Sequence, residues 1–176
     1  PSGAAVAFAR SLAQELAALE CVLLSGYHKG IERLTAEAML ESGGSVIVVL
    51  PLGLCANARL LADLNALLRS SRLLVLSPAT CDAPYSDALA AARLPLIAAM
   101  SELLVAVEPE QQPDGWLQAL RPPLPATAFW QGAGAPTARE WQTQGAALVN
   151  SVEQALTIWQ DTRDGAGYAP KQDESA

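Results

Sequence analysis

The sequence predicts an α/β fold, a Rossmann-like three-layer αβα arrangement built on a mostly parallel sheet. Three observations lead to this class. Short apolar runs of four to six residues alternate with segments in which apolar residues recur at helical spacing. Most of those runs are continuously apolar, as strands covered on both faces are. One of them runs into a Gly-x-x-x-Gly turn, which is followed by a helical segment and then by a second apolar run. This order is typical of a strand, helix and strand that together bind a nucleotide or a phosphate.

The first hundred residues are expected to hold helices and strands in alternation. In chain order we predict a helix over 6–19, a strand over 21–24, a helix over 31–41, a strand over 46–50, a helix over 57–69, a strand over 73–76 and a helix from about 85 to 100. Gly43 and Gly44 end the second of these helices, and Asn57 caps the third. Pro95 should kink the last one or split it in two.

The remaining residues continue the alternation more loosely. We predict a strand over 103–107, a short helix within 115–120, a strand over 126–130, a helix from 137 and a last helix over 152–160. One domain over residues 1–160 and a mobile tail over 161–176 are therefore expected. Because such folds usually begin with a strand and this sequence begins with a helix, we also expect a strand that precedes Pro1.

Composition narrows the class of protein. The sequence has 176 residues, of which 51% are hydrophobic and 16% charged, which suits one substantial core. No apolar run approaches the ~18 residues that a membrane span needs, and the first residues lack the basic flank of a signal peptide. We therefore expect a cytoplasmic protein with no membrane partner. The formal net charge of −7 has the wrong sign for an extended basic surface, so any nucleic-acid site should be a local pocket.

Residues suited to metal binding or catalysis are sparse. Cys21, Cys55 and Cys81 show no CxxC spacing and no pairing with histidine, so we expect three reduced thiols and no metal site. The sequence has one histidine and therefore offers no Ser/His/Asp set. Glu108 and Asp114 follow a predicted strand, but solvated loop acids explain them better than an acid and base pair does. We predict no catalytic residues, no cofactor and no enzymatic activity.

The turn after the first predicted strand is the candidate site. Gly26 and Gly30 let the backbone turn tightly and bring N–H groups toward an anion at the start of the next helix, and Lys29 adds a positive charge. The alternative is a close turn that binds nothing. Glu32 either stabilises the helix dipole or accepts a hydrogen bond from a ribose hydroxyl, and His28 either contacts a ligand or is a solvated loop residue.

Two further residues leave alternatives open. Arg93 lies in an otherwise apolar helix, where it contacts phosphate or is a surface arginine with a buried stem. Tyr27 stacks on a base or packs at the rim of the turn.

Four segments together resemble the DNA-processing protein A (DprA/Smf) family. Residues 25–32 and 45–54 are similar to that family's Ser-Gly-x-Ala-Arg-Gly-Ile-Asp and Gly-Gly-x-Thr-Ile-Ala-Val-Leu-x-x-Gly-Leu motifs, at matching spacing. Residues 93–102 resemble its Arg-Asn-Arg-Ile-Ile-Ala-Gly-Leu-Ser segment, and residues 145–156 its closing helix entry. The resemblance covers most of residues 20–157.

The resemblance implies an extended Rossmann fold that binds single-stranded DNA in a basic pocket, tends to form a homodimer, and helps to load a RecA-type recombinase in transformation and recombination. It places the phosphate contacts at Ser25, Gly26, His28, Lys29, Gly30 and Arg93. The sequence departs from the family at Lys29, where the family has arginine, and at Leu94 and Pro95, which replace asparagine and arginine. A lysine keeps the charge but lacks the bidentate fork of arginine.

A DNA-processing protein that binds single-stranded DNA is therefore the leading hypothesis. The alternatives are a nucleotide or nucleoside-phosphate binder of the lysine-decarboxylase-like Rossmann group, which uses the same loop, and a degenerate scaffold that only contacts proteins.

Overall fold

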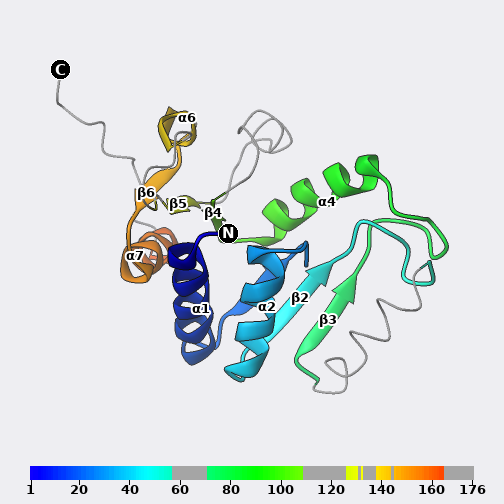
Figure 1. The fold of residues 1–176 in the computed structure, drawn as a ribbon, viewed down its shortest axis with the longest axis horizontal. Helices are drawn as coiled ribbons and strands as arrows, with labels where there is room; N and C mark the ends of the chain where they lie inside the picture. The colour runs from blue at the N-terminus through cyan, green and yellow to red at the C-terminus, as the bar shows by residue number, and fades with distance from the viewer. Residues whose placement is uncertain (57–70, 109–125, 131, 133–137, 144, 165–176) are drawn as a thin grey trace. The chain divides into compact units, whose positions relative to one another are not determined.

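The computed structural model describes residues 1–56, 71–108, 126–130, 132, 138–143 and 145–164 (Figure 1). The chain divides into two compact units, residues 1–100 and 101–176, and each is described by itself. No helix of the described ranges is both long and apolar enough to cross a membrane.

The first unit is a parallel sheet with helices. Its elements are α1 (Gly3–Ala18), β1 (Val22–Ser25), α2 (Ile31–Glu41), β2 (Ser45–Val49), β3 (Leu73–Leu76) and α4 (Asp87–Met100). The strands lie in the order β1-β2-β3, and both pairs are parallel, with Val22 opposite Ser45 and Val46 opposite Leu73. Parallel strands bring the carboxyl ends of β1, β2 and β3 to one edge of the sheet. The predicted helix over 57–69 lies outside the described residues.

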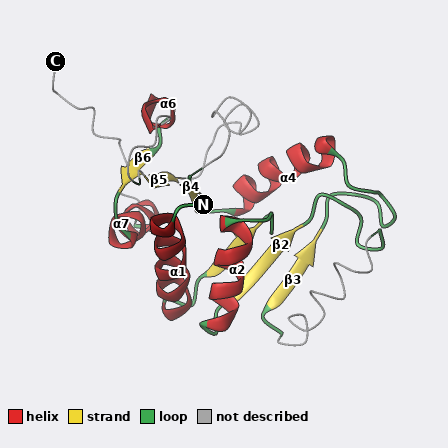
Figure 2. Cartoon of the chain, in the orientation of Figure 1, coloured by secondary structure: helices red, strands yellow, loops and turns green. Residues whose placement is uncertain are grey.

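The core of this unit lies between the sheet and the helices α1 and α2, which run side by side across one face of it (Figures 1 and 2). Met39 from α2 and Val46 and Val48 from β2 are fully buried there. Val49, on the other face of β2, is fully buried as well. Burial on both faces explains why this strand is continuously apolar in the sequence.

Helix α2 ends where the glycine pair predicts. Gly43 has a φ of +84°, the left-handed conformation that glycine adopts without strain, and the N–H of Gly44 donates to the Met39 carbonyl at 2.9 Å. A Cβ on Gly44 would lie 2.6 Å from the Met39 methyl carbon and 3.0 Å from the Ala17 Cβ. A side chain at this position would displace the end of Met39 and press against Ala17 of α1, so glycine fits here best.

Helix α4 runs through Pro95 without being split. Proline has no N–H, so the Ala91 carbonyl loses its bond within the helix, a cost that packing must offset. The helix begins at Asp87, slightly later than predicted, and the Ser86 hydroxyl accepts from the Leu89 N–H at 3.2 Å.

The second unit has its own parallel sheet. Its elements are β4 (Leu103–Val107), β5 (Ala126–Trp130), α6 (Ala138–Thr143), β6 (Ala147–Val149) and α7 (Val152–Arg163). The strands lie in the order β4-β5-β6, both pairs parallel, and α7 packs against all three. Trp141 of α6 is fully buried, with its ring 5.5 Å from that of Phe129. The short strand β6 was not predicted, because three residues beside Gly145 carry too little pattern.

The predicted α/β, Rossmann-like class is confirmed, with the hydrogen bonds of the described strands divided between two parallel sheets. The last helix runs to Arg163, past the predicted start of the tail, and residues 165–176 lie outside the described part. The short helix within 115–120 also lies outside it, as does residue 137, the predicted start of the helix observed as α6 (Ala138–Thr143).

Candidate functional site

The turn between β1 and α2 is held from inside by Ser25. This residue is 5% exposed. Its hydroxyl donates to the Glu32 carbonyl at 3.1 Å and accepts from the Tyr27 N–H at 3.0 Å. The hydroxyl thus ties the last residue of β1 to the first turn of α2, and its role is to shape the turn.

Arg93 reaches the same turn from α4. Its side chain is only 9% exposed, and its Nη1 donates to the Gly26 carbonyl at 2.7 Å. Its Nη2 lies 3.8 Å from the Glu32 Oε2, whose side chain is 30% exposed. The buried Nε has no hydrogen-bond partner among the described residues. The interpretation of Arg93 as a surface arginine with only its stem buried is therefore wrong, because the guanidinium itself is inside the protein.

Gly26 is the residue that makes this arrangement possible. A Cβ at Gly26 would lie 2.7 Å from the Arg93 Cζ and 2.7 Å from the Glu32 Oε2. Any side chain there would displace the guanidinium or the carboxylate. The glycine is needed for close approach of the arginine, whereas the sequence predicts for it a tight turn that brings N–H groups toward an anion.

Glu32 closes the turn through its side chain. Its Oε2 accepts from the His28 N–H at 2.9 Å as well as facing Arg93. Neither sequence hypothesis, the helix dipole or a ribose hydroxyl, included this contact with Arg93. The carboxylate lies in the first turn of α2, where the helix dipole also favours it.

The outer rim of the turn carries the groups that face solvent. His28 and Lys29 are exposed, and Gly30 is the N-cap of α2, with a φ of +114° and no side-chain cap. Within the part of the chain that the structure describes, no group accepts from the N–H of Lys29, Gly30 or Ile31. Free N–H groups at the start of a helix, beside a lysine, can bind an anion.

Tyr27 is already engaged by α2. Its hydroxyl donates to the Glu37 Oε1 at 3.2 Å, and the Arg33 guanidinium lies 5.3 Å from its ring centroid. Burial raises the pKa of the Tyr27 phenol, and the nearby Arg33 opposes that rise. One face of the ring is covered, so this structure favours packing at the rim over stacking on a base.

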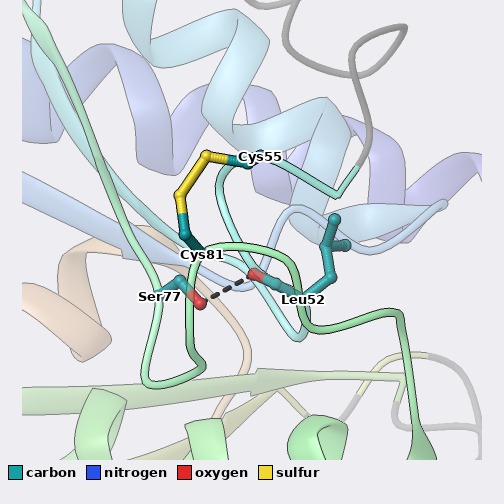
Figure 3. The surroundings of a disulfide bond; sticks show 4 residues. All are labelled: Leu52, Cys55, Ser77 and Cys81. Carbon is teal, nitrogen blue, oxygen red and sulfur yellow. Dashed lines mark hydrogen bonds between the residues drawn. A yellow bond between two sulfur atoms is a disulfide. The ribbon is translucent and has the colours of Figure 1, made fainter.

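The loops that follow β2 and β3 meet at the same sheet edge and are joined by a disulfide between Cys55 and Cys81 (Figure 3). The prediction of three reduced thiols is therefore wrong for this pair. An odd number of cysteines does not prevent two of them from pairing, and Cys21 is the free one. The residues follow adjacent parallel strands at similar distances, a signal in the sequence that predicts their proximity.

The sequence also singled out the acids Glu108 and Asp114. Asp114 lies outside the described residues, so the pair Glu108 and Asp114 stays untested. Trp130 and Trp141 are buried in the second unit, where they form part of its core.

The family model described as DNA recombination-mediator protein A matches residues 1–121. The chain belongs to this family. The matched range includes the turn over 25–30, Arg93 and both disulfide cysteines. No curated protein sequence matches the chain significantly.

Solved structures agree on the fold. DNA processing protein A (DprA) from Streptococcus pneumoniae aligns with a TM-score of 0.72 and 22% identity, over 89% of this chain and 57% of that protein. The chain thus spans little more than half the length of that relative. The DNA processing protein A of Helicobacter pylori, described by its single-stranded DNA binding mode, aligns with a TM-score of 0.73 and 17% identity, over 93% of this chain and 76% of that one.

A second group of structures has the same fold. Two structures of the molybdenum cofactor carrier protein of Chlamydomonas reinhardtii align with TM-scores of 0.60 and 0.56 and 16% identity, over 93% of this chain and 90% of that one. The fold is therefore shared beyond the family to which this chain belongs.

Proposed function

We propose that the chain binds single-stranded DNA through backbone phosphate at the turn between β1 and α2. The observation that carries the proposal is the buried Arg93, which bonds the Gly26 carbonyl and faces Glu32. With the turn held by Arg93 from inside, Lys29 lies exposed at its rim, next to free N–H groups at the start of α2. A preshaped turn of this kind binds phosphate with little loss of conformational entropy.

We infer the wider role from the resemblance to the family. The protein takes part in DNA uptake and recombination as a non-enzymatic homodimer that cooperates with a RecA-type recombinase. Family membership and the single-stranded DNA binding of the Helicobacter pylori relative support this assignment. On the residues of this chain, Ser25, Gly26 and Arg93 shape the turn, while His28, Lys29 and Gly30 face the phosphate.

Charge limits how the DNA is held. The net charge is −7, and the Glu32 carboxylate lies beside the turn. The protein as a whole therefore does not attract DNA from a distance, and binding depends on local contacts at the turn. Each phosphate that a cation neutralises releases counterions. For single strands, a plot of the logarithm of the binding constant against the logarithm of the salt concentration falls with a slope of about 0.7 per phosphate contact. A small slope is therefore expected.

The test is fluorescence anisotropy of a labelled single-stranded oligonucleotide at several salt concentrations, with the native chain, Lys29→Ala and Arg10→Ala. Arg10 matches Lys29 in charge but pairs with Glu41 at 3.9 Å, at the opposite end of α2 from the turn. We expect Lys29→Ala to weaken binding about tenfold and to lower the salt slope, and Arg10→Ala to bind like the native chain. Absence of binding at low salt, or equal loss in both variants, would contradict the proposal.

A second candidate is a nucleotide or other small phosphorylated ligand at the same turn. The observation that favours it is that Lys29 is the one permanent cation in residues 25–30, which suits one phosphate better than a polyanion. Saturable thermal stabilisation by a mononucleotide, with little salt dependence, would select this candidate. If neither ligand binds, the chain acts through protein contacts alone.

A further inference from the structure

The Cys55–Cys81 disulfide lies at the surface of the first unit, and neither the family nor the proposed function assigns it a role. Both cysteines are exposed. Cys55 follows β2 and Cys81 follows β3, so the bond joins the two loops that leave the carboxyl ends of neighbouring strands (Figure 3). Exposed disulfides are the ones that a thiolate in solution attacks most readily.

The two loops are also held together by bonds that do not involve sulfur. The Cys55 N–H donates to the Cys81 carbonyl at 2.7 Å, and the Gly53 N–H donates to the Ala83 carbonyl at 2.8 Å. The Ser77 hydroxyl donates to the Leu52 carbonyl at 2.7 Å (Figure 3). The two cysteine Cα atoms are 5.0 Å apart with the disulfide in place. Because these bonds do not depend on sulfur, we expect them to keep the two thiols close enough to pair again after reduction.

We propose that Cys55 and Cys81 form a reversible thiol–disulfide site that locks these two loops and responds to a dithiol reductant. One thiolate of the reductant attacks a cysteine sulfur, the disulfide breaks, and the other cysteine leaves as a thiolate that takes up a proton. The second thiol of the reductant then attacks the mixed disulfide. The protein gains two electrons and two protons as two thiols, and the reductant becomes a disulfide.

The lock connects to the turn through the core. Leu50 and Leu52 lie between the end of β2 and Cys55, and both belong to the buried cluster of the first unit. Tyr27 of the turn packs against the same cluster. Reduction loosens the loop over 50–56 and, through this packing, the turn that carries Lys29. This consequence rests on the proposed function, so oxidised protein should bind single-stranded DNA more tightly than reduced protein.

The experiment compares the full chain before and after treatment with dithiothreitol. Titration of thiols in the unfolded protein should find Cys21 alone in the oxidised state and all three cysteines after reduction. Hydrogen exchange at 50–56 and 77–83 should quicken several-fold on reduction and return after reoxidation. The double variant Cys55→Ser/Cys81→Ser should match the reduced protein and ignore dithiothreitol, while Cys21→Ser should behave like the native chain.

The proposal is overturned if Cys55 and Cys81 are free thiols in protein purified without reductant and then exposed to oxidised glutathione. It is also overturned if hydrogen exchange is equally fast in the oxidised and the reduced protein, or if the bond does not re-form after reduction. Uptake of Zn²⁺ by the reduced protein with exchange as slow as in the oxidised state would overturn it too, because Cys55, Cys81 and Asp82 place three ligand atoms within 4.8 Å and would then be a metal site. DNA binding is read separately. Exchange that responds to redox state without DNA binding in either state contradicts the proposed function and leaves the redox site standing.

Discussion

Replacing Arg93 with methionine tests whether this residue holds the turn together. Methionine keeps an unbranched side chain in the helix and removes the guanidinium. The variant loses a charge-assisted hydrogen bond to the Gly26 carbonyl at 2.7 Å, for which about 1.5–3 kcal/mol is typical. It also loses the attraction to Glu32 at 3.8 Å, about 4 kcal/mol at an effective dielectric constant of 20.

Burial of the guanidinium offsets much of that attraction, because Arg93 has given up its hydration and its Nε is unpaired among the described residues. Glu32 is 30% exposed and regains water when the arginine is removed. We therefore expect Arg93→Met to lower the free energy of unfolding by about 2–3 kcal/mol.

The assay is urea unfolding followed by tryptophan fluorescence and by circular dichroism, with a double-mutant cycle between Arg93→Met and Glu32→Gln. Since the two side chains face each other, the cycle should give a coupling energy of about 1–2 kcal/mol. Lys29→Ala, which removes an exposed cation from the same turn, should change stability by less than about 0.5 kcal/mol. Native stability in Arg93→Met, or a coupling energy near zero, would refute the argument that the buried arginine supports the turn.

Three other perturbations have defined outcomes. Cys55→Ser/Cys81→Ser removes a bond between residues 26 apart in the sequence and, by the chain-entropy model, should lower the free energy of unfolding by about 3.5 kcal/mol. The measurement is the urea midpoint relative to oxidised native protein, and an unchanged midpoint would mean that the bond adds no stability. Gly30→Ala should cost about 1–3 kcal/mol in thermal unfolding because its φ is +114° although the space around its Cβ is open, whereas Gly3→Ala, also with open space, should be nearly neutral. The raised pKa of Tyr27 favours the neutral phenol in the folded state, so its contribution to stability is present at neutral pH and is lost as pH rises above 10; Tyr27→Phe should abolish this part of the alkaline destabilisation, and an identical pH profile would contradict it.

The boundaries of several elements were predictable because they depend on local pattern. The helix over 31–41 and the strands over 73–76, 103–107 and 126–130 lie where the sequence predicts them. Each is a run of suitable period bounded by glycine, proline or polar residues, and such a run buries the same side in any parallel α/β fold. The strand over 147–149 escaped prediction because a short strand depends on its neighbour, β5, for its hydrogen bonds.

The candidate site shows the same division. Sequence alone pointed to the turn, since Gly26, Lys29 and Gly30 form a local pattern within a few residues. It also named Arg93, but the alternatives for that residue could not be separated without knowing what lies opposite the side chain. The structure places its guanidinium against Gly26 and Glu32. Gly26 is 67 residues away from Arg93 along the chain.

What the sequence by itself determined is the α/β class, most element boundaries and the position of the turn, because periodicity, glycine conformation and helix capping act over a few neighbouring residues. What only the tertiary structure decided is which distant groups meet. Cys55 pairs with Cys81 because parallel strands bring their carboxyl ends, and the loops that follow them, to one edge of a sheet. Arg93 is buried beside Gly26 because helix α4 brings its guanidinium to the turn that follows β1, across 67 residues of sequence.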